Sequence, residues 1–148
     1  MQKFHLSRRH AVALAVASLG VSNRASAQDL SFAGLYGAVT SDGIQLTDKA
    51  KGMVGGVVTI RGFMAPPLKA ESDFFVLTRY PMSSCPFCSN AADWPVDIVF
   101  VRLGHTADAV TASYAIAVTG TLDIGMQADP ATGFVSLVRV IDATWRQV

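Results

Sequence analysis

Two cysteines, Cys85 and Cys88, are the residues of this chain whose type and spacing most clearly suit a chemical task. They are the only two cysteines in the sequence, and they form the pattern C-x-x-C. This pattern suits thiol–disulfide exchange, in which one thiolate attacks and the other resolves a mixed disulfide. It also suits coordination of one metal ion by two thiolates, or a structural disulfide.

As a redox pair, Cys85 would be the nucleophile and Cys88 the resolving thiol. The Pro-Phe dipeptide between them also occurs in glutaredoxin-like sites. A helical turn after Cys88 would place Cys85 at a helix N-terminus, where unpaired backbone N–H groups favour the thiolate. However, Trp94-Pro95 would end such a helix after roughly one turn, because proline keeps the preceding residue out of helical geometry. Thioredoxin-like motifs instead lie near a βαβ unit.

As a metal site, the two thiolates supply only half of a closed zinc site, which takes four ligands. His105 is the main candidate for a third ligand, since it is the only histidine after residue 27. Cu(I) accepts fewer and softer ligands, including a thioether. The expected metal is therefore Zn or Cu(I), held by Cys85, Cys88 and His105. Further candidates, each also explained by packing or by a strand end, are Asp93, Asp97, Met64 and Met82.

A structural disulfide between Cys85 and Cys88 would close a very small loop. Such a ring restricts the unfolded chain less than a long-range bridge does, so it stabilises only modestly. In an oxidising compartment, however, a disulfide is the default state of neighbouring cysteines. The compartment therefore matters to all three interpretations.

Residues 1–27 have the three parts of a cleavable export signal. Arg8 and Arg9 stand in a positive segment, residues 11–21 are weakly apolar, and Ala25-Ser26-Ala27 matches an A-x-A cleavage site. The adjacent arginines favour the twin-arginine route over the general secretory route. We therefore expect a periplasmic protein. The apolar segment is too short to remain as a membrane anchor, so no stable membrane insertion is expected after cleavage.

Removal of the signal reverses the sign of the net charge. The full chain carries a formal charge of +1, whereas residues 28–148 hold eight lysines and arginines against eleven aspartates and glutamates. Nucleic-acid binding needs a basic surplus, so a nucleic-acid partner is excluded. The carboxylates Asp42, Asp73, Asp108 and Asp123 are scattered singly and are expected in solvated turns.

Residues 28–148 are predicted to form one mainly β domain. Branched and alternating residues predict five strands, at Val57–Phe63, Phe74–Thr78, Asp97–Leu103, Ala115–Ile124 and Phe134–Ala143. Turn residues at Asp129–Gly133 separate the last two strands.

One short helix is predicted at Asp48–Met53, with Thr47 as its N-cap. Before it, Leu30–Tyr36 is an apolar lead-in and Thr40–Gly43 is turn-like. A long loop from Pro81 to Pro95 carries both cysteines, and His105 directly after Gly104 is expected in a connection. These features favour a small five-stranded, partly open OB-like barrel, with a small sandwich as the alternative.

Several stretches resemble a family of exported bacterial proteins without assigned function. They are Val58–Leu68, Phe74–Leu77, the cysteine-bearing loop and Val118–Leu122. The most distinctive part is Gly-Phe-Met-x-Pro-Pro-Leu, which begins at Gly62. The resemblance implies a small periplasmic β-barrel, in some cases alongside ABC-type transport systems linked to metal supply.

The cysteine loop departs from that family in one respect. Relatives often place a histidine and a proline run after the loop cysteine, whereas Pro86, Phe87 and Cys88 follow Cys85 here. An exchange of cysteine for histidine keeps a metal ligand but removes a dithiol. The departure therefore favours metal coordination over redox chemistry.

The leading hypothesis is a non-enzymatic periplasmic binding or accessory protein. It would present the loop of Cys85 and Cys88 to a soft transition metal, or to an ABC-type transport system or another periplasmic partner. The first alternative is a thiol–disulfide oxidoreductase with Cys85 as nucleophile. The second is an interaction barrel in which a Cys85–Cys88 disulfide only braces the loop.

Overall fold

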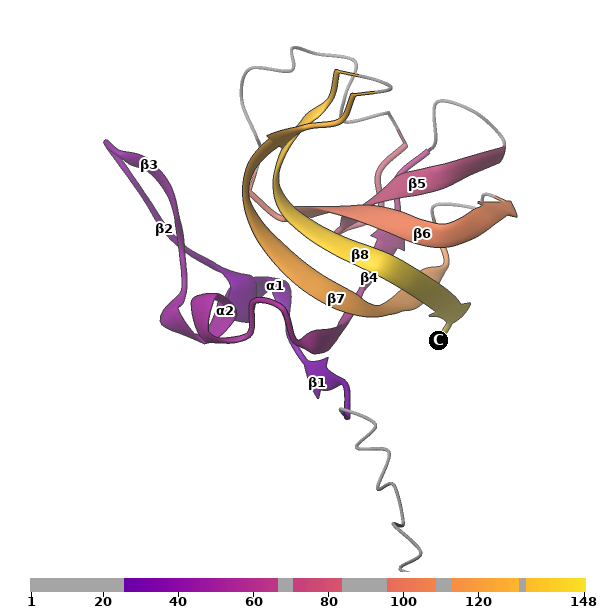
Figure 1. The fold of residues 1–148 in the computed structure, drawn as a ribbon, viewed down its shortest axis with the longest axis horizontal. Helices are drawn as coiled ribbons and strands as arrows, with labels where there is room; N and C mark the ends of the chain where they lie inside the picture. Colours follow the sequence, from indigo (N-terminus) through magenta and orange to yellow (C-terminus); the bar gives the residue numbers. More distant parts are fainter. Residues whose placement is uncertain (1–25, 67–70, 84–95, 109–112, 131–132) are drawn as a thin grey trace, which may run out of the picture.

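The structure, a computed structural model, describes residues 26–66, 71–83, 96–108, 113–130 and 133–148. Its described part is mainly β, with two short helices (Figure 1). The elements are β1 (Gln28–Asp29), α1 (Phe32–Leu35), β2 (Tyr36–Thr40), β3 (Gly43–Leu46), α2 (Asp48–Gly52), β4 (Val57–Met64), β5 (Glu71–Thr78), β6 (Ile98–Asp108), β7 (Ala115–Ala128) and β8 (Val135–Gln147). None of the described helices is long and apolar enough to cross a membrane.

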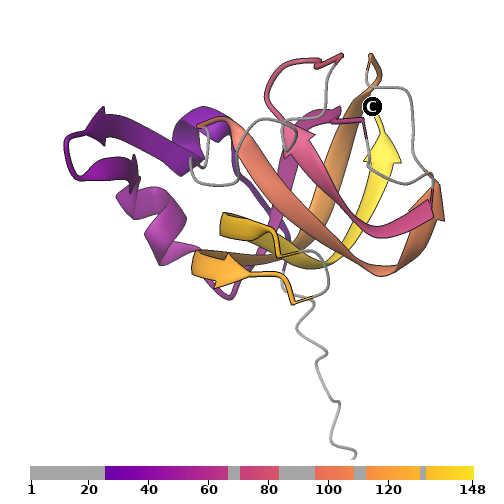
Figure 2. The ribbon, with the colours of Figure 1, turned by 90° about the horizontal axis from the view of Figure 1, so that it is seen from above.

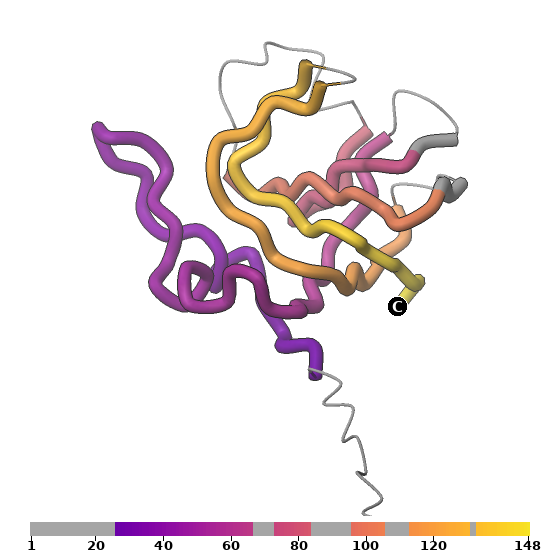
Figure 3. Tube along the Cα trace, viewed as in Figure 1, coloured from indigo at the N-terminus to yellow at the C-terminus, as the bar shows by residue number. Residues whose placement is uncertain are grey.

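Five long strands form a ring of pairings. β4 pairs with β5, β5 with β6, β6 with β8 and β8 with β7, and β7 returns to β4. Only the β6–β8 pairing is parallel within this ring. β1 adds a short parallel pairing to β4. Figure 2 shows these strands wrapping around a common interior, and Figure 3 shows β7 and β8 curving side by side.

Alternate residues of the ring strands fill this interior. Along β4, Val58 and Ile60 are fully buried while Arg61 is exposed, as expected for a strand with one face on the core. The same core contains Leu35 of α1 and Ala50 of α2. Other fully buried members are Leu77, Val99, Val101, Ile116, Val118, Leu122, Val138 and Val140. The helices therefore belong to the same hydrophobic core as the ring.

Two glycines allow neighbouring strands of the ring to approach each other closely. A Cβ atom on Gly62 of β4 would overlap the carbonyl oxygen of Thr78. A Cβ atom on Gly120 of β7 would lie 2.7 Å from the carbonyl oxygen of Ile141, and equally close to a methyl group of Val140. Both glycines stand in the stretches that carry the family resemblance. A strand glycine commonly marks such a close backbone approach.

The predicted helix and the first predicted strand are confirmed. Thr47 caps α2, accepting a hydrogen bond from the backbone N–H of Ala50 at 3.1 Å. β4 covers the predicted Val57–Phe63 and one further residue. The other four strands exist but are longer than predicted, because cross-strand pairing extends them past their branched residues. The third begins at Ile98, since Asp97 has a left-handed φ of 70°.

The N-terminal lead-in is more structured than predicted. It contains α1, a single turn capped by Ser31, which is too short to show a helical period in the sequence. The predicted turn at Thr40–Gly43 joins β2 and β3, two strands that were not predicted. This hairpin extends away from the ring (Figure 1).

The location predicted for His105 was wrong. It lies within β6, because β5 reaches back to Glu71 and pairs with Asp108. The register shifts between the pairs Phe74–Arg102 and Ser72–Ala107. Over this stretch β6 contains more residues than the part of β5 that it faces. His105 is exposed in this irregular part of the strand. Thus the residue lies in a bulge and not in a connection.

Candidate functional site

Most of the residues singled out for chemistry lie outside the described residues. This applies to Cys85 and Cys88, to Asp93, and to Arg8, Arg9 and Ala25 of the export signal. Ala27 is described and exposed, directly before β1. The disulfide Cys85–Cys88 and the distances from either thiol to other ligands therefore stay predictions.

The structure does describe both ends of the connection that carries the cysteines. Thr78 at the end of β5 pairs with Ile98 at the start of β6. Beyond them, the N–H of Arg79 donates to the carbonyl oxygen of Asp97 at 3.0 Å. The side chains of the same two residues form an ion pair at 3.4 Å. We call the four residues Thr78, Arg79, Asp97 and Ile98 the loop root.

The loop root is tied to the ring by a buried hydroxyl. The Thr78 side chain lies within 3.2 Å of the Phe63 carbonyl oxygen and within 2.7 Å of that of Tyr80. Thr78 is only 2% exposed. Because a hydroxyl carries one hydrogen, it donates to one of these carbonyls at a time. The root is therefore held by backbone pairing, a buried hydroxyl and an ion pair together.

Exposed apolar side chains flank the loop root. Tyr80 is 61% exposed and Val96 is 39% exposed, on either side of the root. The Arg79 guanidinium lies 5.2 Å from the centre of the Tyr80 ring. Single exposed apolar residues are ordinary, but these two stand at the two ends of one connection. The base of the loop thus offers both charge and apolar surface.

Three of the other candidate ligands have described positions. Met64 is 2% exposed and belongs to the core, as expected from its packing role. Asp97 pairs with Arg79 at the root. Met82 is half-buried and lies in the described part of the loop. Of these three, Met82 is the donor nearest in sequence to the cysteines.

The structure does not bring His105 to the loop root. The root adjoins Ile98 at the beginning of β6, and His105 lies towards the other end of that strand. Seven residues of strand span up to about 23 Å. The described residues also contain no group of three or more histidine, cysteine and acidic side chains suited to a metal ion.

A polar cluster on the outer face of β6, β7 and β8 escaped the sequence prediction. Asp73 and Asp123, expected in turns, lie on strands and form ion pairs with Arg102 and Arg139 respectively. The arginine partners are distant in sequence, so only strand pairing reveals them. We call these four residues the outer-face cluster, of which Arg102, Asp123 and Arg139 line a cavity of about 480 Å³.

Arg139 is the most enclosed member of the outer-face cluster. Its side chain is 8% exposed, and its Nε donates to Asp123 at 2.8 Å. One terminal nitrogen donates to the carbonyl oxygens of Gly125, at 2.7 Å, and Ser136, at 3.0 Å. These bonds span the register shift in β7 between Ile124 and Gln127. Arg139 therefore fixes the irregular part of the β7–β8 pair.

Arg102 connects the same cluster to stacked aromatic rings. It pairs with Asp73 at 3.2 Å and with Asp129, and its guanidinium lies 5.6 Å from the Phe100 ring centre. Phe100 in turn stacks on Phe74 at 5.3 Å and on Phe134 at 5.6 Å. The guanidinium and the three rings thus form one continuous set of contacts that joins β5, β6 and the residue before β8.

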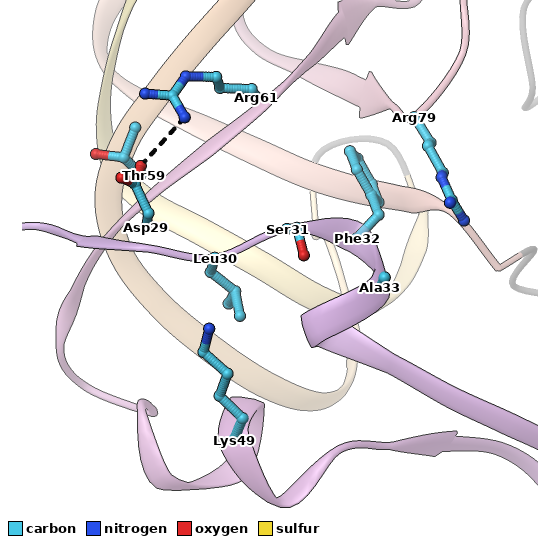
Figure 4. A pocket seen from close by; sticks show the side chains of 9 residues that line it. All are labelled: Asp29, Leu30, Ser31, Phe32, Ala33, Lys49, Thr59, Arg61 and Arg79. Atoms are coloured by element: carbon cyan, nitrogen blue, oxygen red, sulfur yellow. Dashed lines mark ion pairs between the residues drawn. The ribbon is translucent and has the colours of Figure 1, made fainter.

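A second cavity, of about 440 Å³, lies where β1 and α1 meet β4 (Figure 4). Its wall includes Arg79 of the loop root and two further cations, Lys49 and Arg61. We call it the edge cavity. All three of these cations are exposed, whereas the outer-face cluster contains the nearly enclosed Arg139.

Comparison with known proteins shows a likeness of fold alone. No family model and no curated protein matches the sequence. Among solved structures, the chain is similar to a DUF3299 family protein from Pseudomonas aeruginosa PAO1, with a TM-score of 0.55 and 12% identity. The match covers 83% of this chain and 97% of that chain. At this identity the likeness carries no activity from one protein to the other.

Proposed function

We propose that this protein is an exported, non-enzymatic binding or accessory protein that presents Cys85 and Cys88 at one end of an OB-like barrel. The order of strand pairing supports the barrel, because the ring closes β4-β5-β6-β8-β7 with one parallel pair, β6–β8. A five-stranded, partly open Greek-key barrel is the arrangement of the OB fold.

The observation that carries this proposal is the loop root. Strand pairing of Thr78 with Ile98 and the backbone bond from Arg79 to Asp97 hold the two ends of the connection together, and the partly exposed ion pair adds a weaker contact. The buried Thr78 hydroxyl ties the end of β5 to Phe63 of β4. A rigid scaffold that fixes a loop at its base is the usual way in which folds display binding residues. The proposed display of two thiols requires such a base.

The available donors favour Cu(I) over Zn as the bound metal. His105, the simplest third ligand for a tetrahedral zinc site, lies towards the end of β6 remote from the root. Met82 lies three residues before Cys85 and can supply a thioether. Two thiolates and a thioether form a soft, low-coordinate set that suits Cu(I). Cys85 and Cys88 would bind the ion, and Met82 would complete its coordination.

An export route agrees with the start of the fold. Gln28, the first residue after the predicted cleavage site, pairs with Val58 as the first residue of β1. Cleavage after Ala27 would thus leave β1 whole. N-terminal sequencing of the protein from a periplasmic extract should begin at Gln28.

The test is to purify the mature protein from periplasm without chelator or reductant, and to measure bound metal and free thiols together. Stoichiometric metal that is lost in both Cys85→Ser and Cys88→Ser supports the proposal. Met82→Leu should weaken Cu(I) binding while His105→Ala should not. Metal-free protein with a bridge that exchanges with a model disulfide would instead indicate the oxidoreductase. A metal-free bridge that resists reduction would indicate a structural disulfide.

A further inference from the structure

The edge cavity gathers cations from three separate elements. Lys49 belongs to α2, Arg61 to β4, and Arg79 follows β5 at the loop root. Figure 4 shows Arg61 and Arg79 on opposite sides of Phe32, with Lys49 reaching up from α2. The three positive groups are therefore spread around the cavity and do not meet at one point.

The cavity carries an excess of positive charge, whereas residues 28–148 as a whole carry an excess of negative charge. Residues 28–148 hold eight basic and eleven acidic side chains. Three of the basic side chains line the edge cavity, whereas Asp29 is the one acidic residue among its described lining residues. An excess of cations in an acidic chain creates a local field that attracts anionic groups.

These cations are held only loosely by the protein. Arg61 pairs with Asp29 at 3.5 Å, and both side chains are more than half exposed, at 59% and 71%. Arg79 pairs with Asp97 through one contact at 3.4 Å. Lys49 makes no ion pair with the described residues. Exposed single-contact pairs contribute little to stability, so an incoming carboxylate can replace them.

Leu30, Phe32 and Ala33 line the cavity between the cations, together with the polar residues Ser31 and Thr59. Leu30 is 1% exposed and Phe32 is 4% exposed, and Ala33 lies beside them. A compact phosphate group suits several donors that converge on one spot, which this cavity does not provide. Separate cations around a lining of mixed polarity instead match carboxylates that are spaced along a chain.

We infer that the edge cavity docks an acidic segment of a partner protein, with carboxylates paired to Lys49, Arg61 and Arg79. This inference rests on the proposed function and names the chemistry of its partner. Because Arg79 belongs to both the cavity and the loop root, docking would bring the partner next to the base of the cysteine-bearing connection. Electrostatic attraction of this kind mainly governs association rate and specificity.

The test uses a fluorescein-labelled peptide of alternating glutamate and leucine, its glutamine counterpart, and citrate. Binding to the full mature protein is followed by fluorescence polarisation at rising salt. The glutamate peptide should bind with an affinity that falls with salt. The double variant Lys49→Gln/Arg61→Gln should weaken binding by about tenfold.

The matched control is Lys51→Gln/Arg146→Gln, which removes the same charge from exposed residues that do not line the cavity. It should change binding less than about twofold. Equal weakening in both double variants would overturn the inference, and so would equal binding of the glutamine peptide. Binding of citrate without binding of the peptide would also overturn it.

The outcome for docking can be told apart from the outcome for the metal. Protein that retains its metal but does not bind the peptide would refute docking and leave the proposed function intact. Protein that is purified without metal but binds the peptide would refute the proposed function and leave docking intact. Peptide binding that is retained in Cys85→Ser would show that docking does not depend on this thiol. The thermal unfolding midpoint of each double variant shows that any loss of binding is not a loss of folding.

Discussion

The outer-face cluster and the edge cavity use the same kinds of side chain in different ways. Arg139 of the outer-face cluster is nearly enclosed and bonds to three residues on its own sheet. Arg61 of the edge cavity is mostly exposed and holds one carboxylate through a long contact. Enclosed charges with full hydrogen bonding specify structure, whereas exposed charges with weak partners are free to bind. The structural role of Arg139 and the proposed binding role of Arg61 therefore differ in burial and in number of partners, and not in residue type.

The largest effect is expected for Arg139→Gln. The substitution removes the guanidinium donors of the partly exposed Asp123 carboxylate, the Gly125 carbonyl and the buried Ser136. The free energy of unfolding should fall by about 3 kcal/mol, since breaking an enclosed charge pair is costly. Urea denaturation measures this change. Arg146→Gln on the same strand is the control and should stay within about 0.5 kcal/mol; equal losses would contradict a special role for Arg139.

The close approach of β7 and β8 at Gly120 is expected to give the second-largest effect. Gly120→Ala places a methyl group 2.7 Å from the Ile141 carbonyl oxygen, and neither strand can move freely. The expected loss is about 2 kcal/mol in the free energy of unfolding. Gly104→Ala in β6 meets nothing within 4 Å and serves as the control. A harmless Gly120→Ala would show that the crossing is looser than described.

Arg102→Gln should have an intermediate effect. Arg102 holds Asp73 and Asp129, but its side chain is 37% exposed, so water can replace part of what is lost. A loss of about 1 kcal/mol is expected in chemical denaturation. The double variant Arg102→Gln/Asp73→Asn should lose less than the two single changes added together, because they remove the same ion pair. Simple additivity would argue against the pair.

The smallest effect on stability is expected at the edge cavity. Arg61→Gln removes a contact between two exposed side chains, so the free energy of unfolding should change by less than about 0.5 kcal/mol. A loss as large as that of Arg139→Gln would abolish the distinction between the two regions. Small losses at Arg61 and large ones at Arg139 would sharpen it.

The sequence was informative where a local signal fixes the structure. Thr47 and the residues after it predict α2 with its cap, because the capping bond joins residues three apart. Branched residues predict β4 with nearly its observed bounds. The long connection between β5 and β6 was predicted from its prolines and from the strands on each side.

The outer-face cluster could not be predicted because its partners meet only across strands. Asp123 lies opposite Arg139 in the β7–β8 register, and Asp73 reaches Arg102 from β5 to β6. In the sequence, each aspartate stands alone, and an isolated aspartate is typical of a solvated turn. The same holds for ring closure, in which Val57 pairs with Thr121. A signal for these contacts exists only once the register is known.

The loop root also has a consequence for how this protein could diversify. The backbone bond and the ion pair between Arg79 and Asp97 join the chain just after β5 to the chain just before β6. Lengthening an already anchored connection adds only a small entropic cost, which grows with the logarithm of its length. A related chain could therefore carry a connection of different length and composition between the same two strand ends.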